Sequence, residues 1–182
     1  MNAQSIVYGT GQYNPAGTKA LFYYAYVEDI LSMPVLADPA TATTLASLVE
    51  MATAVVMKTG KRIFDHYATS EENEVKCTLV GSRDGKGYEN SFEYKFPGND
   101  PIQLGFQAST ANRQVVLWVP EKNGRVRLIG SLEDPAYMET AEYTSGKKIA
   151  DSRGTIITFK ASAATPAPIY TPALTSLLTV AS

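Results

Sequence analysis

Cysteine and histidine are almost absent from this chain of 182 residues, which contains one of each, Cys77 and His66. A single cysteine excludes an intrachain disulfide, and a thiol in a strand-like segment is most often a small buried hydrophobe. One histidine and one cysteine cannot fill the protein positions of a typical zinc site without carboxylates. We therefore expect neither a metal nor a cofactor.

Charge is also scarce, since 19% of the residues are charged and the formal net charge is −2. The sequence has no basic stripe to neutralise phosphates, so we expect at most non-specific contact with DNA. A charge-poor surface leaves area that can pack against neighbouring subunits.

Long apolar runs are missing as well. No segment approaches the roughly 18 residues that span a bilayer. The first residues, Met1 to Ile6, have neither the basic nor the apolar region of a secretory leader. We expect a protein that is made in a cytoplasm and has no membrane partner.

What the sequence does contain is a series of strand patterns separated by turn residues. In 74–80 the side chains of Val75, Cys77 and Leu79 share one face, and Asp84-Gly85 is typical of the turn that follows. Asn123-Gly124 marks a second hairpin turn. The strands predicted in this way are 20–29, 62–68, 74–80, 88–96, 114–119, 125–130, 137–143 and 155–161.

Helical signals are few. Asp100 followed by Pro101 has the pattern of an N-cap and first helical position, and Ile102 and Phe106 then share one face of a short helix over about 101–110. Residues 41–57 stay open. Leu45, Leu48 and Met51 fit a helix, and 53–57 reads as a strand.

These patterns predict a mainly β fold, an antiparallel sandwich or barrel with one or two short helices and extended terminal arms. We divide the chain into an N-terminal arm (1–19), a β domain (20–162) and a Pro-containing C-terminal tail (163–182). The arm is expected to fray or to dock on a neighbour. The apolar tail is expected to dock on its own domain or on the next subunit.

Candidate catalytic residues do not converge. His66 is the only histidine, and its neighbour Asp65 should point to the opposite face of a strand, so we expect a surface or partly buried histidine and no enzyme. The run 84–87 has the composition of a phosphate loop but joins two strands. The remaining acidic groups are best interpreted as solvated: Asp134, Glu139 and Glu142, and the charged loop 71–74.

Aromatic residues gather in the first strand. Tyr23, Tyr24 and Tyr26 could stack on bases or sugars, but the alternation that puts Phe22, Tyr24 and Tyr26 on one face better fits a sheet core or a subunit interface. Trp118 lies in an apolar strand and is expected in the core. No single predicted strand is strongly acidic.

Several turn and strand motifs resemble those of virion structural proteins of tailed phages that infect gut Bacteroidales, the crAss-like group, and more broadly of tail-tube and neck-ring proteins. The resemblance covers roughly residues 54–172. The motifs are Lys-Thr-Gly-Lys (58–61), Val-Gly-Ser (80–82), Arg-Leu-Ile-Gly (127–130), Thr-Ser-Gly-Lys (144–147), Asp-Ser-Arg-Gly (151–154) and Pro-Ala-Pro-Ile-Tyr (166–170).

The resemblance implies a homo-oligomeric ring that lines a DNA passage in a phage tail or neck, made in the host cytoplasm, with other virion proteins (portal, ring or tail components) as partners. Loops and terminal arms would bridge subunits. The candidate inter-subunit contacts are Arg83, Asp84, Lys86, Lys147, Lys148, Arg153 and Tyr170. The alternative function is a carbohydrate- or protein-binding β-sandwich module with an aromatic platform.

Overall fold

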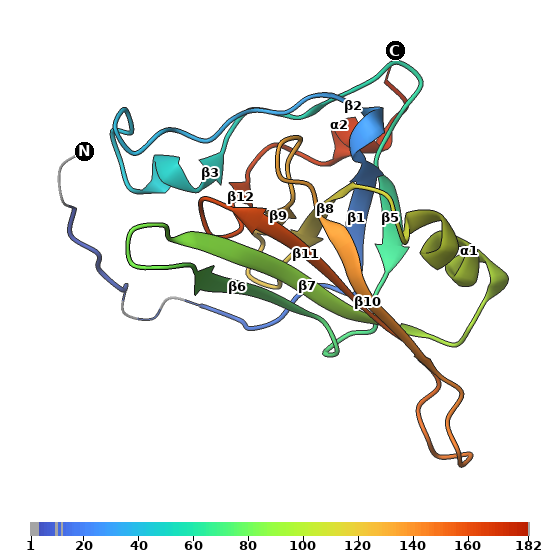
Figure 1. Cartoon of the computed structure of the whole chain (residues 1–182). Coiled ribbons are helices and arrows are strands. Elements are labelled where there is room, and N and C mark those ends of the chain that lie inside the picture. Colours follow the sequence, from blue (N-terminus) through green and yellow to red (C-terminus); the bar gives the residue numbers. More distant parts are fainter. Residues whose placement is uncertain (1–3, 10, 12, 182) are drawn as a thin grey trace.

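A computed structural model describes residues 4–9, 11 and 13–181 of the chain, which form a mainly β structure (Figure 1). Residues 1–3, 10 and 12 of the predicted arm and residue 182 of the predicted tail lie outside the described residues. The helices are α1 (Pro101–Thr110) and α2 (Thr175–Leu178), and single 3₁₀ turns occur at Val27–Asp29 and Ala46–Leu48.

The strands form three sheets. The six-stranded sheet has the spatial order β3 (Glu50–Met51), β12 (Ile169–Tyr170), β9 (Val126–Ile129), β8 (Val115–Pro120), β1 (Leu21–Tyr26) and β5 (Phe64–Tyr67). The four-stranded sheet has the order β10 (Tyr137–Thr144), β11 (Gly154–Ala163), β7 (Gly87–Pro97) and β6 (Glu74–Val80). A small third sheet pairs β2 (Ile30–Ser32) with β4 (Val56–Met57).

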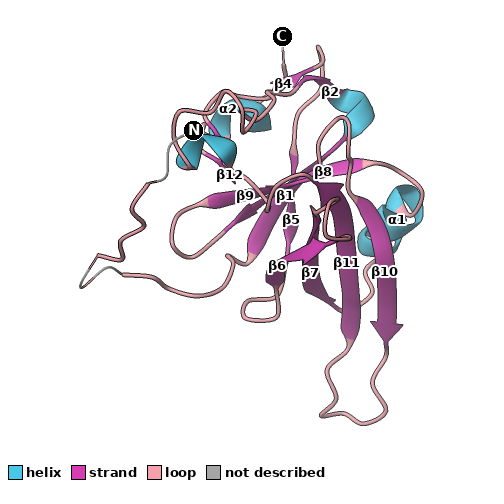
Figure 2. Cartoon of the chain, turned by 60° about the vertical axis from the view of Figure 1, so that its left-hand side comes forward, coloured by secondary structure: helices cyan, strands magenta, loops and turns pink. Residues whose placement is uncertain are grey.

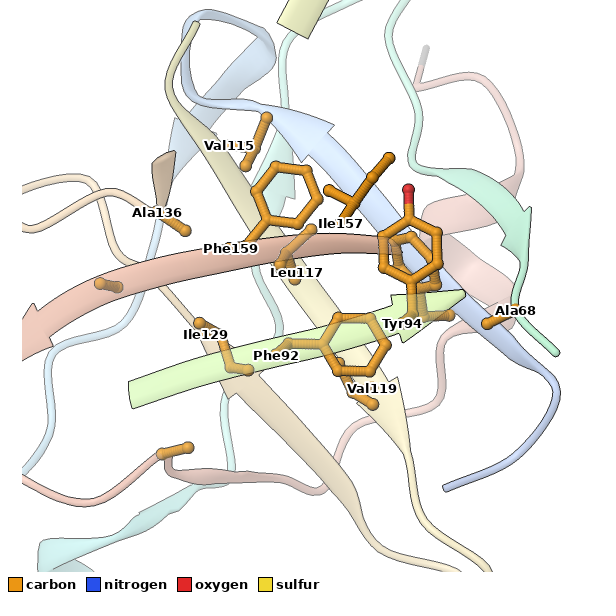
Figure 3. Close-up of a cluster of buried hydrophobic side chains, with 13 residues drawn as sticks. Ala68, Phe92, Tyr94, Val115, Leu117, Val119, Ile129, Ala136, Ile157 and Phe159 are labelled. Carbon is orange, nitrogen blue, oxygen red and sulfur yellow. The ribbon is translucent and has the colours of Figure 1, made fainter. Parts of the chain in front are cut away.

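The two larger sheets face each other across a core of buried side chains (Figure 3). The six-stranded sheet contributes Phe22, Leu117 and Ile129, and the four-stranded sheet contributes Phe92 and Phe159, all at most 1% exposed. Alternation along each strand produces this layer, because every second residue of a strand points to the same side. The predicted sandwich is confirmed, and the strands of the described residues do not close into a barrel.

A second core covers the other face of the six-stranded sheet. Trp118 and Leu128 point to this side and pack with Met51, Ile63 and Leu177. β8 is therefore buried along its whole length, which explains why its sequence is a continuous apolar run and does not alternate. Trp118 belongs to the core, as predicted.

The C-terminal tail builds part of this second core. β12 lies between β3 and β9, and the Tyr170 side chain is 2% exposed against Trp118. Its hydroxyl accepts a hydrogen bond from the backbone N–H of Val55 (3.2 Å). The tail docks on its own domain, which is one of the two places predicted for it. The prediction of Tyr170 as an inter-subunit contact is wrong, because its side chain is enclosed within one subunit.

Residues 41–57 contain only one 3₁₀ turn (Ala46–Leu48) and no α-helix. The tail explains why a helix through Met51 does not form. The backbone carbonyls of Val49 and Met51 accept hydrogen bonds from Ile169 (2.7 Å) and Thr171 (3.1 Å), which hold this segment extended. The strand predicted at 53–57 is reduced to β4, Val56–Met57.

Helix α1 begins as predicted but turns a different face inward. The Asp100 carboxylate caps it by accepting from the backbone N–H of Ile102 (2.8 Å). Ile102 is nevertheless 83% exposed, while Gln103 and Thr110 are buried and Phe106 packs against the core. The apolar spacing of Ile102 and Phe106 was misleading because the helix covers a buried polar group, His66, which needs an amide partner.

Candidate assembly surface

The only histidine is buried among aromatic side chains. His66 is 9% exposed and stacks on Phe22, with Tyr94, Phe96 and Phe106 around it at ring-centroid distances of 4.8 to 5.6 Å. Asp65 is exposed on the opposite face of β5, as strand geometry predicted. The ring is more deeply buried than the surface or partly buried position that we expected, because α1 covers it.

Both ring nitrogens of His66 have close oxygen neighbours. Nδ1 lies 2.7 Å from the Tyr67 carbonyl oxygen, and Nε2 lies 2.8 Å from Oε1 of Gln103. A neutral imidazole carries one N–H and can donate to only one of these oxygens, unless the Gln103 amide turns to present its NH2. Burial lowers the pKa of His66 below its ordinary value, and this outweighs the opposing effect of the two hydrogen bonds.

The tyrosines of β1 are partly buried and pack on the two cores. Tyr24 is half-buried against Phe64 and Phe106, and burial raises its pKa to about 12. The Arg113 guanidinium covers the ring of Tyr26 at 3.5 Å. Tyr23 packs on the second core. These residues serve the fold, in agreement with the interpretation of their alternation as core packing.

Two groups of predicted contact residues lie at opposite ends of the four-stranded sheet. Arg83, Asp84 and Lys86 are exposed in the β6–β7 turn. Lys147, Lys148 and Arg153 are exposed in the β10–β11 loop, which projects beyond the body of the molecule in both views (Figures 1 and 2). The register of β7 separates them: Gly87 pairs with Val80, whereas Pro97 pairs with Gly154. The structure does not bring the two groups together.

The outer face of the four-stranded sheet is open to solvent. Ile156 is 42% exposed there, although its neighbour Ile157 is fully buried on the inner face. Alternation and register assign the charged side chains of this face: Glu74, Lys76, Glu89, Glu93, Lys95, Glu139, Glu142 and Lys160. Five glutamates therefore face three lysines, and the carboxylates come from three different strands, which is why no single strand looked acidic in the sequence.

Both edges of this sheet are free of partner strands among the described residues. β6 pairs only with β7, and β10 pairs only with β11. These edges are seven and eight residues long, whereas the edge strands of the six-stranded sheet, β3 and β5, have two and four. A long unpaired edge presents a row of N–H and C=O groups to any strand that fits it.

Cys77 lies on one of these edges and is exposed, against the expectation of a buried thiol. It does point to the apolar side of the sheet with Val75 and Leu79, as predicted, because they lie opposite Asn90, Phe92 and Tyr88 of β7. The buried core between the sheets ends at β7, however, and Leu79 on β6 is 53% exposed. The apolar side of the alternating pattern in β6 is therefore exposed to solvent, because the strand lies at the edge of the sheet.

No protein-family model matches the chain, and no curated protein or solved structure is significantly similar to it. Within the described residues, no helix has the length and apolar character needed to cross a membrane. In the same part of the chain, no group of three or more His, Cys, Asp and Glu side chains is placed to hold a metal ion.

Proposed function

We propose that this chain is a structural subunit that associates edge to edge, β10 of one copy against β6 of the next, into a closed homo-oligomeric ring. In the setting that its motifs resemble, the ring belongs to a phage tail or neck and lines the passage for DNA. The observation that carries the proposal is the pair of long, free and complementary edges on one sheet.

The direction of the strands favours a ring over a twofold pair. The four-stranded sheet is antiparallel throughout, so its two edge strands run in opposite directions. A rotation about an axis along the strands keeps every strand direction, and β6 therefore meets the next copy's β10 in antiparallel orientation. Repeated head-to-tail contacts of this kind close into a ring when the rotation divides the full circle.

The side chains of the two edges suit this pairing. On β10, Ala141 and Tyr143 point to the inner side, since they lie opposite Ile157 and Thr155 of β11. Setting Tyr143 against Val75 and Ala141 against Cys77 joins the apolar sides. The same register sets Glu142 against Lys76 on the outer side, and opposite charges in such cross-strand pairs are stabilising.

The β-bulge of β10 restricts this pairing to one register. The pairing with β11 shifts between Met138 and Thr140, so Glu139 is the extra residue. Bulges at a sheet edge discourage indiscriminate strand addition. With the bulge absorbed, Met138 comes to lie beside the exposed Leu79, which continues the apolar side of the joint.

The outer face of the sheet fits a DNA passage. We propose that the open outer face of each four-stranded sheet, which carries five glutamates and three lysines, turns toward the lumen of the ring. Each phosphate contact made by a cation adds affinity and would slow passage. A face with an excess of carboxylates repels phosphate and allows DNA to slide.

The test is the mass of the purified chain by light scattering over a range of concentrations, with negative-stain images of the same samples. The wild-type chain should form rings or tubes. Leu79→Lys places a charge on the apolar side of the edge and should give a monomer with unchanged thermal unfolding, because Leu79 is 53% exposed.

Ile102→Lys is the matched control, since it puts the same charge on another exposed apolar residue that lies on α1, outside both edges. It should assemble like the wild type. A wild-type chain that stays monomeric at every concentration, or a Leu79→Lys chain that still forms rings, would contradict the proposal. A stable monomer that binds glycans would instead favour the binding-module alternative.

A further inference from the structure

The loop between β10 and β11 ends in a basic tip. Lys147, Lys148 and Arg153 are exposed, and Ile149, which follows Lys148, is fully exposed. None of these three cations forms an ion pair with another described residue. The loop projects from the sandwich in both views (Figures 1 and 2). An apolar side chain flanked by unpaired cations is a surface that fits an acidic partner.

The tip has an ordered backbone. Oδ2 of Asp151 accepts hydrogen bonds from the backbone N–H groups of both Lys147 and Lys148, each at 2.8 Å. Gly146 makes the turn with φ 73°, and a Cβ there would lie 2.9 Å from Cβ of Asp151. These contacts fix the backbone at the two lysines, which lowers the backbone entropy that is lost when the tip binds a partner.

An acidic hollow of about 530 Å³ lies at the beginning of β6. Its lining includes Glu71, Glu72, Glu74 and Glu93, with Lys95 as the single cation. Three of the four carboxylates already have a partner in their own chain: Glu71 pairs with Lys122 (3.8 Å), Glu72 with Lys95 (2.5 Å) and Glu74 with Lys76 (2.8 Å). These pairs are on the surface, where ion pairs contribute little and exchange partners readily.

The edge pairing proposed above would carry the basic tip to this hollow. With Tyr143 of one copy against Val75 of the next, Thr144 lies beside Glu74. Because the strands are antiparallel, the chain that follows Thr144 runs past the start of β6 toward 71–73. Lys147 and Lys148 lie only a few residues beyond Thr144, so the basic tip approaches the carboxylates of the loop.

We propose that the β10–β11 tip of one subunit binds the hollow at Glu71, Glu72, Glu74 and Glu93 of the next copy in the ring. Lys147 and Lys148 form ion pairs with the carboxylates, and Ile149 packs at the contact. This inference rests on the proposed function, because it takes the neighbouring copy that the edge pairing supplies. This contact, called the clasp below, adds further salt-sensitive ion pairs to a joint that is otherwise made of backbone hydrogen bonds, apolar contacts and the Glu142–Lys76 pair.

The first test is a charge swap read by light scattering. Lys147→Glu/Lys148→Glu should raise the dissociation constant of each contact about tenfold at low ionic strength. Glu71→Lys/Glu72→Lys should do the same, and an equimolar mixture of the two variants should recover association. Arg83→Glu/Lys86→Glu is the matched control at the other end of the sheet and should behave as the wild type.

The second test is a designed cross-link. Cys77→Ser removes the one native thiol, and Lys148→Cys with Glu71→Cys then places one thiol on each side of the contact. Mild oxidation should give a ladder of covalent oligomers on a denaturing gel, and neither single-cysteine variant should give more than dimers.

The outcomes separate the two proposals. Rings that tolerate the charge reversal and give no ladder overturn the clasp and leave edge-to-edge assembly standing. Charge-reversed variants that fail to associate, that do not recover on mixing, but that unfold like the wild type also overturn the clasp as a pairing of these two surfaces. A chain that is monomeric throughout overturns both proposals together.

Discussion

The two large sheets of this protein differ in how completely the chain itself covers them. The six-stranded sheet is buried on both faces, and the C-terminal tail fills a place inside it. The four-stranded sheet is covered on one face only, and both of its edges are unpaired among the described residues. One sheet is completed by its own chain, while the other leaves open edges, at which our proposal places a second copy.

The largest effect is expected when the Trp118 ring, at the centre of the second core, is removed. Trp118→Ala should lower the free energy of unfolding by about 3–5 kcal/mol, because this β8 side chain is fully buried in the second core, which the tail helps to form. Urea unfolding followed by circular dichroism measures it. Leu79→Ala on the open sheet is the matched truncation and should cost less than about 1 kcal/mol. Equal losses would contradict the contrast between the sheets.

A smaller loss is expected when one polar contact of the tail, the Tyr170 hydroxyl, is removed. Tyr170→Phe deletes the hydroxyl that accepts from the Val55 N–H and leaves that buried donor unpaired. The free energy of unfolding should fall by about 1–2 kcal/mol, with the ring packing on Trp118 preserved. Hydrogen exchange should show faster opening of β12 than of β7. Unchanged protection in β12 would show that the backbone hydrogen bonds and apolar contacts of the tail hold it without this hydroxyl.

The sequence predicted best where local signals are strong. β6, α1 and the hairpin through Asn123-Gly124 lie where alternation, capping and turn residues placed them, and Gly124 adopts the positive φ of 89° that such a turn requires. These features depend on neighbouring residues only. They are therefore visible without knowledge of the rest of the fold.

Long-range partners decided the elements that were missed. Met51 is held in a strand by Thr171, and Gln103 is buried by His66, so neither position follows from its own segment. The acidic face needs three strands in register before its glutamates meet, and the exposure of Cys77 depends on where the sheet ends. A pattern of alternation reports which side chains share a face, but it does not report whether that face is covered.

The junction between the two sheets should respond to pH. Burial lowers the pKa of His66 below its ordinary 6.5, so the unfolded chain binds this proton more tightly than the folded chain. The contribution of neutral His66 to the free energy of unfolding is therefore fully present above pH 6.5. It is lost as the pH falls from 6.5 through the lowered pKa of the folded state. Thermal unfolding between pH 5 and 8 measures this slope. His66→Gln should flatten it, and an unchanged slope would assign it to other groups.

The smallest effect on the isolated subunit is expected at the cross-strand pair of the edges. Glu142→Lys should change the free energy of unfolding by no more than about 0.5 kcal/mol, since the residue is exposed. It should weaken association several-fold by facing Lys76 of the next copy. The double variant Lys76→Glu/Glu142→Lys should restore the association that the single variant loses. Failure of the double variant to recover would exclude the proposed register while leaving other edge pairings open.

The position of β12 also fixes the order in which the fold can be completed. β3 joins the six-stranded sheet only through β12, so Glu50 and Met51 wait for Ile169 and Tyr170, which are made more than a hundred residues later. During synthesis the sheet therefore stays unfinished until residue 170 has left the ribosome, whereas both edges of the four-stranded sheet are already present by residue 163. Contacts of such long sequence separation form slowly. We therefore expect the edges of the four-stranded sheet to form before β3 and β12 complete the six-stranded sheet.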